Sequence, residues 1–400
     1  MIREAGKNED LMREELASPT VLVARGIKGW IESGELMPGE PIPSIRSLSE
    51  QFEATQHAVY MAVRQLEREG YLGREGRSRV VMSKLPSVGA EDEIIDMKVM
   101  VLSRDHWYGD DHVSPGHLWY IVMGVFHSLR HHHSEVKTLD PEAFSTQSFL
   151  QILNDRPDGV VAFRDAMAMS PVTALLEIQA AGLPLVVYGY GDELGSFDTV
   201  MSDQAAGMYE LTKFFADRGC KRILRYWEMP QGSRYEQGEL PAWLHMRNSG
   251  YERAMAECGF KPVDAYYGEE LPIDVDDRRT FKARAYHVAG HLAEAIALHG
   301  KVDAVIAITD GVSFYLREAC RILGLPDVMV GGYDNYWHQL PEREWSGDFG
   351  PMVTVDKCNR KIGRELVDLL LARMKGELGE RSEHRLVKPE LVILDKSMKT

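Results

Sequence analysis

Two groups of residues in this sequence have types and spacing suited to chemistry, and the first is a short N-terminal stretch. Residues 56–69 place polar and aromatic side chains beside an apolar stripe of helical spacing. Amide and guanidinium groups near the start of a helix can hydrogen-bond to base edges in the major groove. The Gly-rich segment 73–79 adds arginines that can reach phosphates or the minor groove. These features favour DNA binding, with a small helical domain for protein contacts as the alternative. The candidate contact residues here are Thr55, Gln56, His57, Tyr60, Arg64, Arg74, Arg77 and Arg79.

Local signals predict the elements that position these side chains. An apolar face of helical spacing precedes a turn rich in Gly and Pro. Ser44 and Thr55 are suitable N-caps for the two helices that follow. Short apolar segments on both sides of the Gly/Arg-rich tip predict a β-hairpin, or wing. The expected helices span 20–33, 45–52 and 56–69, and the hairpin strands lie at 71–72 and 80–82.

The stretch GELMPGEPIPSIRSLSEQFEATQHAVYMAVRQLEREGYLGREGRSRVV resembles the winged helix-turn-helix of GntR-family transcription regulators. The matching features are the Gly34…Pro38-Gly39 turn, Pro43-Ser44-x-Arg46, Leu48-Ser49 and Leu66-Glu67-x-Glu69-Gly70. The resemblance covers about residues 20–83. It implies that Arg46 contacts DNA together with the start of the third helix.

The sequence departs from the GntR pattern at the expected contacts. The family usually shows Ser-Arg-Thr-Thr-Val-Arg where this chain has Thr55-Gln56-His57-Ala58-Val59-Tyr60, so Gln56 and Tyr60 replace two arginines. Gln can bond an adenine edge bidentately, whereas Arg favours guanine. Either the preferred operator differs from the common one of the family, or the affinity for DNA is weaker.

The charge distribution separates this stretch from the rest of the chain. The 400 residues carry a net charge of −15, but residues 1–89 hold 12 basic and 13 acidic residues, which leaves −14 for the remainder. Residues 45–84 alone hold 7 basic and 5 acidic residues. An acidic body repels DNA except where a basic patch faces it, so the N-terminal stretch is the expected contact surface.

Beyond residue 97, strand-like and helical segments alternate, which predicts parallel sheets covered on both faces. About 300 residues of this pattern favour two α/β lobes, with a ligand at the carboxyl ends of the strands. The expected strands are 98–102, 136–139, 158–163, 184–188, 222–226, 304–308 and 329–331. The expected helices are 118–130, 146–154, 171–181, 205–218, 248–258, 286–298 and 312–323.

Segments of this region are similar, in order and spacing, to blocks of the LacI-family regulator core, the periplasmic-binding-protein-like type I fold. They are VMSDQAAGMYELTKFFADRGCKRI, HMRNSGYERAMAECGF, DAVIAITDGVSFYLREACRILGLPD, VGGYDN and VTVDKCNRKIGRELVDLLL. The resemblance covers roughly residues 97–396 and implies an effector cleft. The residues it implies there are Arg247, Thr309, Asp310 and Asp334, with Ser103 and Asp105 from the other lobe and Lys357 at the crossing between lobes.

This set of side chains suits a polyol, because carboxylates and amides bond vicinal hydroxyls and an Arg fork spans two oxygens. An aromatic ring could stack on the apolar face of a sugar, and Trp107, Tyr188 and Trp337 follow strands. Ordinary packing is the alternative for each ring.

Other signals exclude several function classes. There is no GxSxG, HExxH or Walker A sequence, so no catalytic residues, metal site or cofactor are expected. The run His131–His133 fits a polar helix end, and Asp276–Arg279 fits a solvated loop. The four cysteines are far apart, the N-terminus is highly charged, and no long apolar run occurs. These features predict a reduced, cytoplasmic protein without a membrane partner.

The sequence therefore predicts a transcriptional regulator, most simply a repressor, that binds an operator as a homodimer and responds to a sugar-like effector. The two alternatives are a solute-binding sensor that does not bind DNA and an enzyme. The expected fold is a winged helix-turn-helix followed by a two-lobed α/β domain. The expected boundaries are 18–83 for the winged helix, 84–96 for the linker and 97–400 for the α/β domain, with lobe one at 97–198 and 356–380 and lobe two at 199–355 and 381–398.

Overall fold

The structure is a computed structural model of the whole chain, and its contacts separate the unit Met1–Glu93 from the unit Ile94–Thr400. It describes residues 19–32, 34–52, 54–68, 71–75, 78–82, 97–102, 117–132, 134–139, 152, 154–165, 168–169, 171–229, 240–273, 277–337, 346 and 350–395. The expected linker and most of the helix expected at 146–154 lie outside these ranges.

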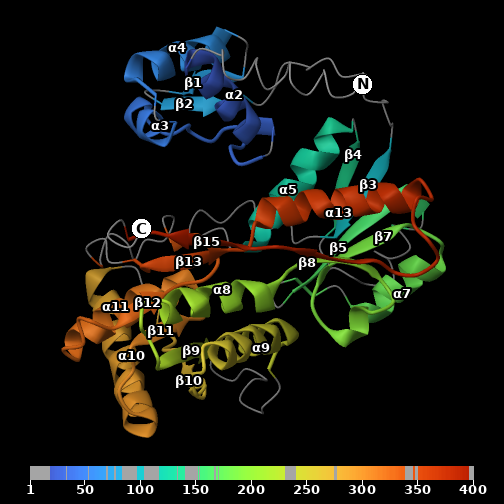
Figure 1. The fold of residues 1–400 in the computed structure, drawn as a ribbon. Helices are drawn as coiled ribbons and strands as arrows, with labels where there is room; N and C mark the ends of the chain where they lie inside the picture. The colour runs from blue at the N-terminus through green and yellow to red at the C-terminus, as the bar shows by residue number, and fades with distance from the viewer. Residues whose placement is uncertain are drawn as a thin grey trace, which may run out of the picture. The chain divides into compact units, whose positions relative to one another are not determined.

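The N-terminal unit contains the three helices and the hairpin that the sequence predicts (Figure 1). Both expected N-caps are present: Ser44 Oγ accepts from Ser47 N at 3.1 Å, and Thr55 Oγ1 accepts from Ala58 N at 3.2 Å. These bonds fix where the second and third helices begin. The elements are α2 (Pro19–Glu32), α3 (Ile45–Gln51), α4 (Gln56–Arg68), β1 (Leu72–Glu75) and β2 (Ser78–Val81).

A small apolar core holds the N-terminal unit together. Val23, Ile27 and Ile31 of α2 pack with Val59 and Val63 of α4, and all five are at most 1% exposed. The Gly/Pro-rich segment before α3 also pairs with the hairpin, since the peptide N–H groups at 39 and 42 donate to carbonyls of β2 at 2.8 and 2.9 Å. The turn thus adds backbone hydrogen bonds that its Gly and Pro content does not reveal.

In the second unit, the first sheet has seven strands in the order β14-β8-β7-β5-β3-β4, with β6 beside β5. All neighbours are parallel except β6. Helices α5 and α13 pack against each other on one face, and α7 covers the other (Figure 1). The strands are β3 (Lys98–Leu102), β4 (Glu135–Leu139), β5 (Gly159–Asp165), β6 (Ala168–Met169), β7 (Leu185–Gly189), β8 (Asp198–Ser202) and β14 (His384–Val387), and the helices are α5 (His117–His131), α7 (Val172–Ala180) and α13 (Asn359–Met374).

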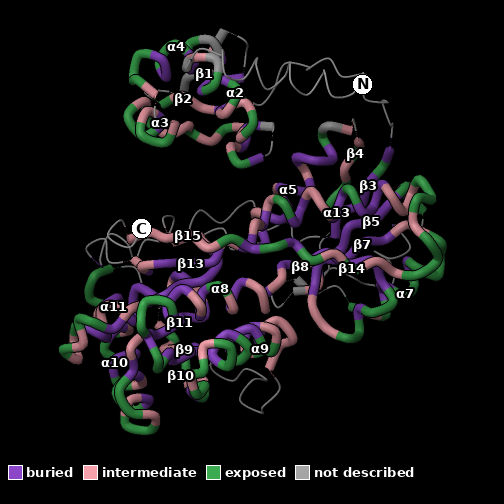
Figure 2. Tube along the Cα trace, in the orientation of Figure 1, coloured by how far each residue is buried: buried purple, intermediate pink, exposed green. Residues whose placement is uncertain are grey.

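Alternate residues of this sheet enter two separate cores. Val161 and Phe163 lie in the cluster under α5 and α13, whereas Val160 and Ala162 lie in the cluster under α7. Figure 2 shows the central strands buried and the outer sides of the helices exposed. Burial on both faces explains why these strands read as continuous apolar runs.

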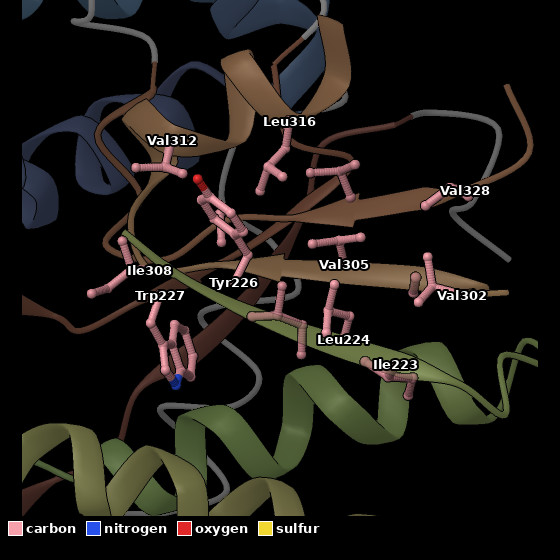
Figure 3. Packing of buried hydrophobic residues seen from close by; sticks show 14 of the residues in the cluster. Ile223, Leu224, Tyr226, Trp227, Val302, Val305, Ile308, Val312, Leu316 and Val328 are labelled. Atoms are coloured by element: carbon pink, nitrogen blue, oxygen red, sulfur yellow. The ribbon is translucent and has the colours of Figure 1, made fainter. Parts of the chain in front are cut away.

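The second sheet has six strands in the order β10-β9-β11-β12-β13-β15, of which only β15 is antiparallel. Tyr226 points toward Val312 and Leu316 of α11, and Trp227 points to the opposite face (Figure 3). Helices therefore cover both faces here as well. The elements are β9 (Ile223–Met229), β10 (Tyr266–Glu269), β11 (Ala304–Ala307), β12 (Met329–Gly331), β13 (Val353–Asp356), β15 (Glu390–Ile393), α8 (Gln204–Ala216), α9 (Ala242–Glu257), α10 (Arg278–His299) and α11 (Asp310–Ile322), and the short η3 (Asp192–Leu194) follows β7 of the first sheet.

The chain crosses between the two sheets three times, and two lobe boundaries differ from those expected. Residues 199–202 and 384–387 were assigned to lobe two, but β8 and β14 pair with each other in the sheet of lobe one. The crossings therefore fall between β8 and α8, between β13 and α13, and between β14 and β15. Strand pairing, rather than the position of the family blocks, decides to which lobe a segment belongs.

The sequence predicts a solvated loop at Asp276–Arg279; Asp276 lies outside the described residues, and the other three are exposed, but Arg278 and Arg279 belong to a helix. The Asp277 side chain accepts from Arg279 N at 2.7 Å and from Thr280 N at 2.8 Å, and α10 begins at Arg278. Because Thr280 also bonds back to Asp277 N at 3.2 Å, the two residues form a capping box. In the described part of the chain, no helix is long and apolar enough to cross a bilayer.

Candidate functional site

The first candidate site is the outer face of α4 in the N-terminal unit. Its inner positions, such as Val59 and Leu66, are fully buried, whereas Gln56, His57 and Tyr60 are exposed, Tyr60 by 43%. The polar side chains named from the sequence therefore lie on one free face that begins at the N-terminus of the helix. Such a face can present amide, imidazole and phenol groups to a groove without unfolding the core.

The arginines of this unit differ in the ion pairs that they form with carboxylates. Glu67 lies 2.8 Å from Arg79 Nε and 3.7 Å from Arg64 Nη1, so one carboxylate serves both. Arg46 pairs with Glu50 at 3.2 Å, but its side chain is 82% exposed. Exposed ion pairs of this kind are weak, so a phosphate can compete with the carboxylate. Arg77 and the side chain of Arg74 lie outside the described residues.

The second candidate site lies at the carboxyl ends of β11, β12 and β13, and Arg247 of α9 is at its centre. Arg247 Nε donates to Gln204 Oε1 at 2.8 Å, and Nη1 donates to the Ile308 carbonyl at 2.7 Å. The guanidinium carbon lies 3.5 Å from the ring centroid of Tyr333. Only 3% of Arg247 is exposed, so the structure holds this cation in one fixed orientation.

Asp334 joins Arg247 to Lys357 through a single oxygen. Its Oδ1 is 2.8 Å from Lys357 Nζ and 3.6 Å from Arg247 Nη2, and all three side chains are at most 4% exposed. Asp334 has a φ of 96°, a backbone conformation that residues other than Gly rarely adopt. Strain of this kind persists where the surroundings hold a side chain in place, often at a binding site.

Asp310 is the second buried carboxylate near this cluster. Its Oδ1 accepts from Thr354 Oγ1 at 2.6 Å, and Oδ2 accepts from the backbone N–H of Tyr336 at 2.8 Å and of Trp337 at 3.1 Å. Burial raises the pKa of Asp310 to about 8, although these hydrogen bonds act in the opposite direction, and the Asp334 charge adds to the increase. Thr309 caps α11 through its hydroxyl, so its role in the structure is to start that helix.

Two residues that sequence reasoning missed connect this cluster to lobe one. Gln204 is the first residue of α8 and is 2% exposed, and its Nε2 donates to the Tyr190 hydroxyl at 2.9 Å. Tyr190 follows β7 of lobe one, and its hydroxyl also accepts from Ser202 N at 3.2 Å. Tyr190 stands directly after β7 and Gln204 two residues after β8, at the carboxyl ends of strands where α/β folds gather ligand groups; for Tyr190 this signal was available, because it closely follows the strand predicted at 184–188.

Of the remaining predicted effector residues, the structure describes only Tyr188, and Tyr188 packs in a core of lobe one. Tyr188 is 0% exposed and lies in the core under α5 and α13, with its ring 6.1 Å from that of Phe163. A sugar has no access to either face of this ring in the structure, which corrects the expectation that Tyr188 lines the cleft. Ser103, Asp105 and Trp107 lie outside the described residues. Among the described residues, no group of His, Cys, Asp or Glu side chains could hold a metal ion.

Comparison with known proteins agrees with both units. Residues 20–82 match the family model of bacterial regulatory proteins of the gntR family, and residues 212–394 match that of the periplasmic binding protein-like domain. The chain is 28% identical to the arabinose metabolism transcriptional repressor of Geobacillus stearothermophilus, over 96% of this chain and 98% of the repressor. These matches confirm the predicted fold class and its order along the chain.

Two further proteins match part of this chain. The HTH-type transcriptional repressor PurR of Photobacterium profundum is 26% identical over 55% of this chain and 59% of its own length, so the match spans little more than half of that repressor. A regulatory protein of the LacI family from Chloroflexus aggregans aligns over 75% of this chain and 98% of its own, at 17% identity and a TM-score of 0.53. This last similarity concerns the fold alone.

Proposed function

We propose that this chain, in which a GntR-type winged helix precedes a two-lobed periplasmic-binding-protein-like domain, is a transcriptional repressor controlled by a small metabolite. Two copies would place their α4 helices in the two halves of a symmetric operator. A polyhydroxylated compound would bind at the Arg247–Asp334 cluster and alter the affinity for DNA. The relative from Geobacillus stearothermophilus, named an arabinose metabolism repressor, matches nearly the whole chain and supports this proposal.

The observation that carries the proposal is the pairing of an exposed polar recognition face with a buried ionic cluster in the second unit. Gln56, His57 and Tyr60 are exposed and can contact DNA, because the opposite side of α4, which includes Val59 and Leu66, holds the helix in the core. A protein that only stored or sensed a solute would not need such a face. This distinguishes the repressor from a solute-binding sensor, the second function considered.

The effector site is suited to hydroxyl groups. Arg247 and Lys357 donate hydrogen bonds, whereas Asp334 accepts them, and vicinal hydroxyls can do both. The Thr354 hydroxyl that bonds Asp310 is fully buried together with that carboxylate, so we propose binding without turnover.

Control of DNA binding requires that the effector prefer one arrangement of the lobes. The hydrogen bonds that Gln204 makes to Tyr190 and to Arg247 lie at the first crossing between the lobes. A ligand that changes these bonds can shift the equilibrium between two arrangements, and a coupling of about 1–3 kcal/mol is typical. In a dimer, this shift would change the spacing of the two α4 helices.

The proposal is tested by fluorescence anisotropy with labelled DNA from upstream of the gene and an unrelated duplex as control. We expect specific binding to the upstream DNA, which decreases when a sugar-like ligand is added. Size-exclusion chromatography with light scattering on the free protein should give the mass of two chains. Specific ligand binding without specific DNA binding would favour the solute sensor, and conversion of the bound sugar would favour an enzyme.

A further inference from the structure

The charges buried around Asp334 are unequal in number. Arg247 and Lys357 are both cations and both lie against one oxygen of Asp334, at 3.6 and 2.8 Å. Buried charges are normally paired, because the desolvation of an unpaired ion is costly. One carboxylate for two buried cations leaves a positive charge that no side chain in this triad neutralises.

The other carboxylates near the cluster do not remove this excess. Asp310 accepts hydrogen bonds from Thr354 and from two backbone amides, and among the described residues it forms no ion pair with Arg247 or Lys357; burial also raises its pKa. Asp203 and Asp356 are partly exposed, and each accepts a backbone N–H, from Ala206 and Cys358 respectively. Solvent therefore screens these two charges far more than it screens Lys357.

Lys357 also has donor capacity to spare. Within the described part of the chain, its ammonium group contacts Asp334 alone, although it carries three N–H groups. Lys357 directly precedes Cys358, the N-cap of α13, whose side chain makes no capping hydrogen bond. A helix that begins here has the positive end of its dipole at this point, so it supplies no negative charge to offset that of Lys357.

We infer that the effector is a polyhydroxylated anion, a sugar acid or a sugar phosphate, whose charged group binds between Lys357 and Arg247. This inference rests on the proposed function, because it names the ligand class of the same site. The anionic oxygens of the ligand would accept hydrogen bonds from N–H groups of Lys357 and Arg247, while Asp334 would accept a hydrogen bond from a neighbouring hydroxyl of the ligand. A neutral sugar offers the same hydroxyls but leaves the second cation without a partner.

The test compares matched ligands on the full-length protein by thermal shift and isothermal titration calorimetry. Each set contains a neutral sugar, its uronic or aldonic acid and its terminal phosphate, for example glucose, glucuronate, gluconate and glucose 6-phosphate, with arabinose and ribose sets alongside. We expect an anionic member of at least one set to bind about 10- to 100-fold more tightly than its neutral partner, which is the range for hydrogen bonds to charged groups. Comparison within a set then distinguishes a carboxylate from a phosphate.

Variants at Lys357 assign the preference to this cluster. Lys357→Gln should reduce the affinity for the anion about 10- to 100-fold, and Lys357→Arg should retain most of it. Lys361→Gln is the matched control, because Lys361 lies on the same helix but is exposed. The comparison of ligands on the unaltered protein needs no variant, so a poorly folded Lys357→Gln would not remove the test.

Three results would overturn the inference: neutral sugars that bind as tightly as their acids and phosphates, a Lys357→Gln protein with unchanged affinity for the anion, or no binding by any anionic member. A neutral sugar that binds as tightly as its acid and its phosphate, and releases DNA, would contradict the charge argument while leaving the proposed repressor intact. Absence of specific DNA binding would contradict the proposed function instead. The ligand measurements and the DNA measurements therefore separate the two ideas.

Discussion

Replacement of Arg247 by Lys tests the centre of the candidate effector site while keeping its charge. The guanidinium group reaches Gln204, Ile308 and Asp334 at the same time, from three different nitrogens. A lysine has one terminal nitrogen and cannot reproduce this fork. We therefore expect Arg247→Lys to lose at least one charge-assisted hydrogen bond. Water cannot readily replace this bond, because only 3% of Arg247 is exposed.

The magnitude follows from the number of contacts. One lost hydrogen bond to a charged group corresponds to about 1.5–3 kcal/mol, so we expect the free energy of unfolding of the α/β unit to fall by about that amount. If a ligand oxygen uses the same fork, its affinity falls about 10- to 100-fold. Arg247→Ala leaves Asp334 paired with Lys357 but removes both hydrogen bonds, to Gln204 and to the Ile308 carbonyl, so at about 1.5–3 kcal/mol each it should cost about 3–6 kcal/mol. The lysine variant is therefore the better probe of binding.

The assay measures ligand and DNA separately on the same protein. Urea unfolding gives the change in stability, a thermal shift gives the response to a ligand found among sugars, sugar acids and sugar phosphates, and anisotropy gives the affinity for upstream DNA. DNA affinity without ligand should stay within about threefold, because α4 belongs to a separate unit. Arg253→Lys is the matched control, since Arg253 is exposed on the same helix. An Arg247→Lys protein with a full ligand response would refute the assignment of this site.

Three other perturbations address DNA binding, pH dependence and stability. Gln56→Ala or Tyr60→Ala should weaken binding to specific DNA by about 1–3 kcal/mol in anisotropy titrations without changing ligand affinity, and unaltered DNA recognition would argue against α4 as the reading element. Because burial raises the pKa of Asp310 to about 8, the folded state holds a proton that the unfolded state releases, so stability should decrease as the pH rises from about 4 to 8. Urea midpoints at pH 5 and pH 8 should show a smaller decrease in Asp310→Asn, and an identical slope would contradict the raised pKa. Asp198→Asn should lower the free energy of unfolding by about 2–3 kcal/mol, since it breaks a two-point ion pair with Arg373 at 2.6 Å that is only partly exposed; a loss below about 0.5 kcal/mol would show that the pair contributes little.

The local structure of the N-terminal unit could be predicted because its signals lie within a few residues of the elements they control. Ser44 and Thr55 each bond a backbone N–H three residues later, so a cap can be recognised without knowledge of the fold. The same kind of signal was present at Asp277 and Thr280, where the capping box begins α10. The charged run there is exposed, as expected, but the prediction of a loop overlooked this signal.

Lobe membership could not be predicted in the same way, because it depends on pairing between distant segments. β8 and β14 are neighbours in one sheet, and Thr199 Oγ1 lies 2.8 Å from His384 Nδ1 across a separation of 185 residues. Neither strand carries a local feature that identifies its partner. The orientation of Tyr188 was hidden for a related reason, since all five residues of β7 are buried and no alternation shows which side faces a core.

The hydrogen bonds of Gln204 to Arg247 and to Tyr190 join segments that are distant in the sequence, so the sequence does not reveal them. They suggest how ligand binding and lobe movement are linked. The side-chain carbonyl oxygen of Gln204 accepts from Arg247, and its amide nitrogen donates to Tyr190. One side chain therefore contacts both the Arg247–Asp334 cluster and lobe one. A ligand that draws Arg247 toward itself must therefore lengthen or reorient the bond to Gln204, and Gln204 then holds Tyr190 less firmly. A change of one or two such bonds corresponds to about 1–3 kcal/mol, which equals the coupling that a ligand-controlled repressor needs. Because Gln204 is also the first residue of α8, the displacement would be transmitted to a whole helix rather than to a loop.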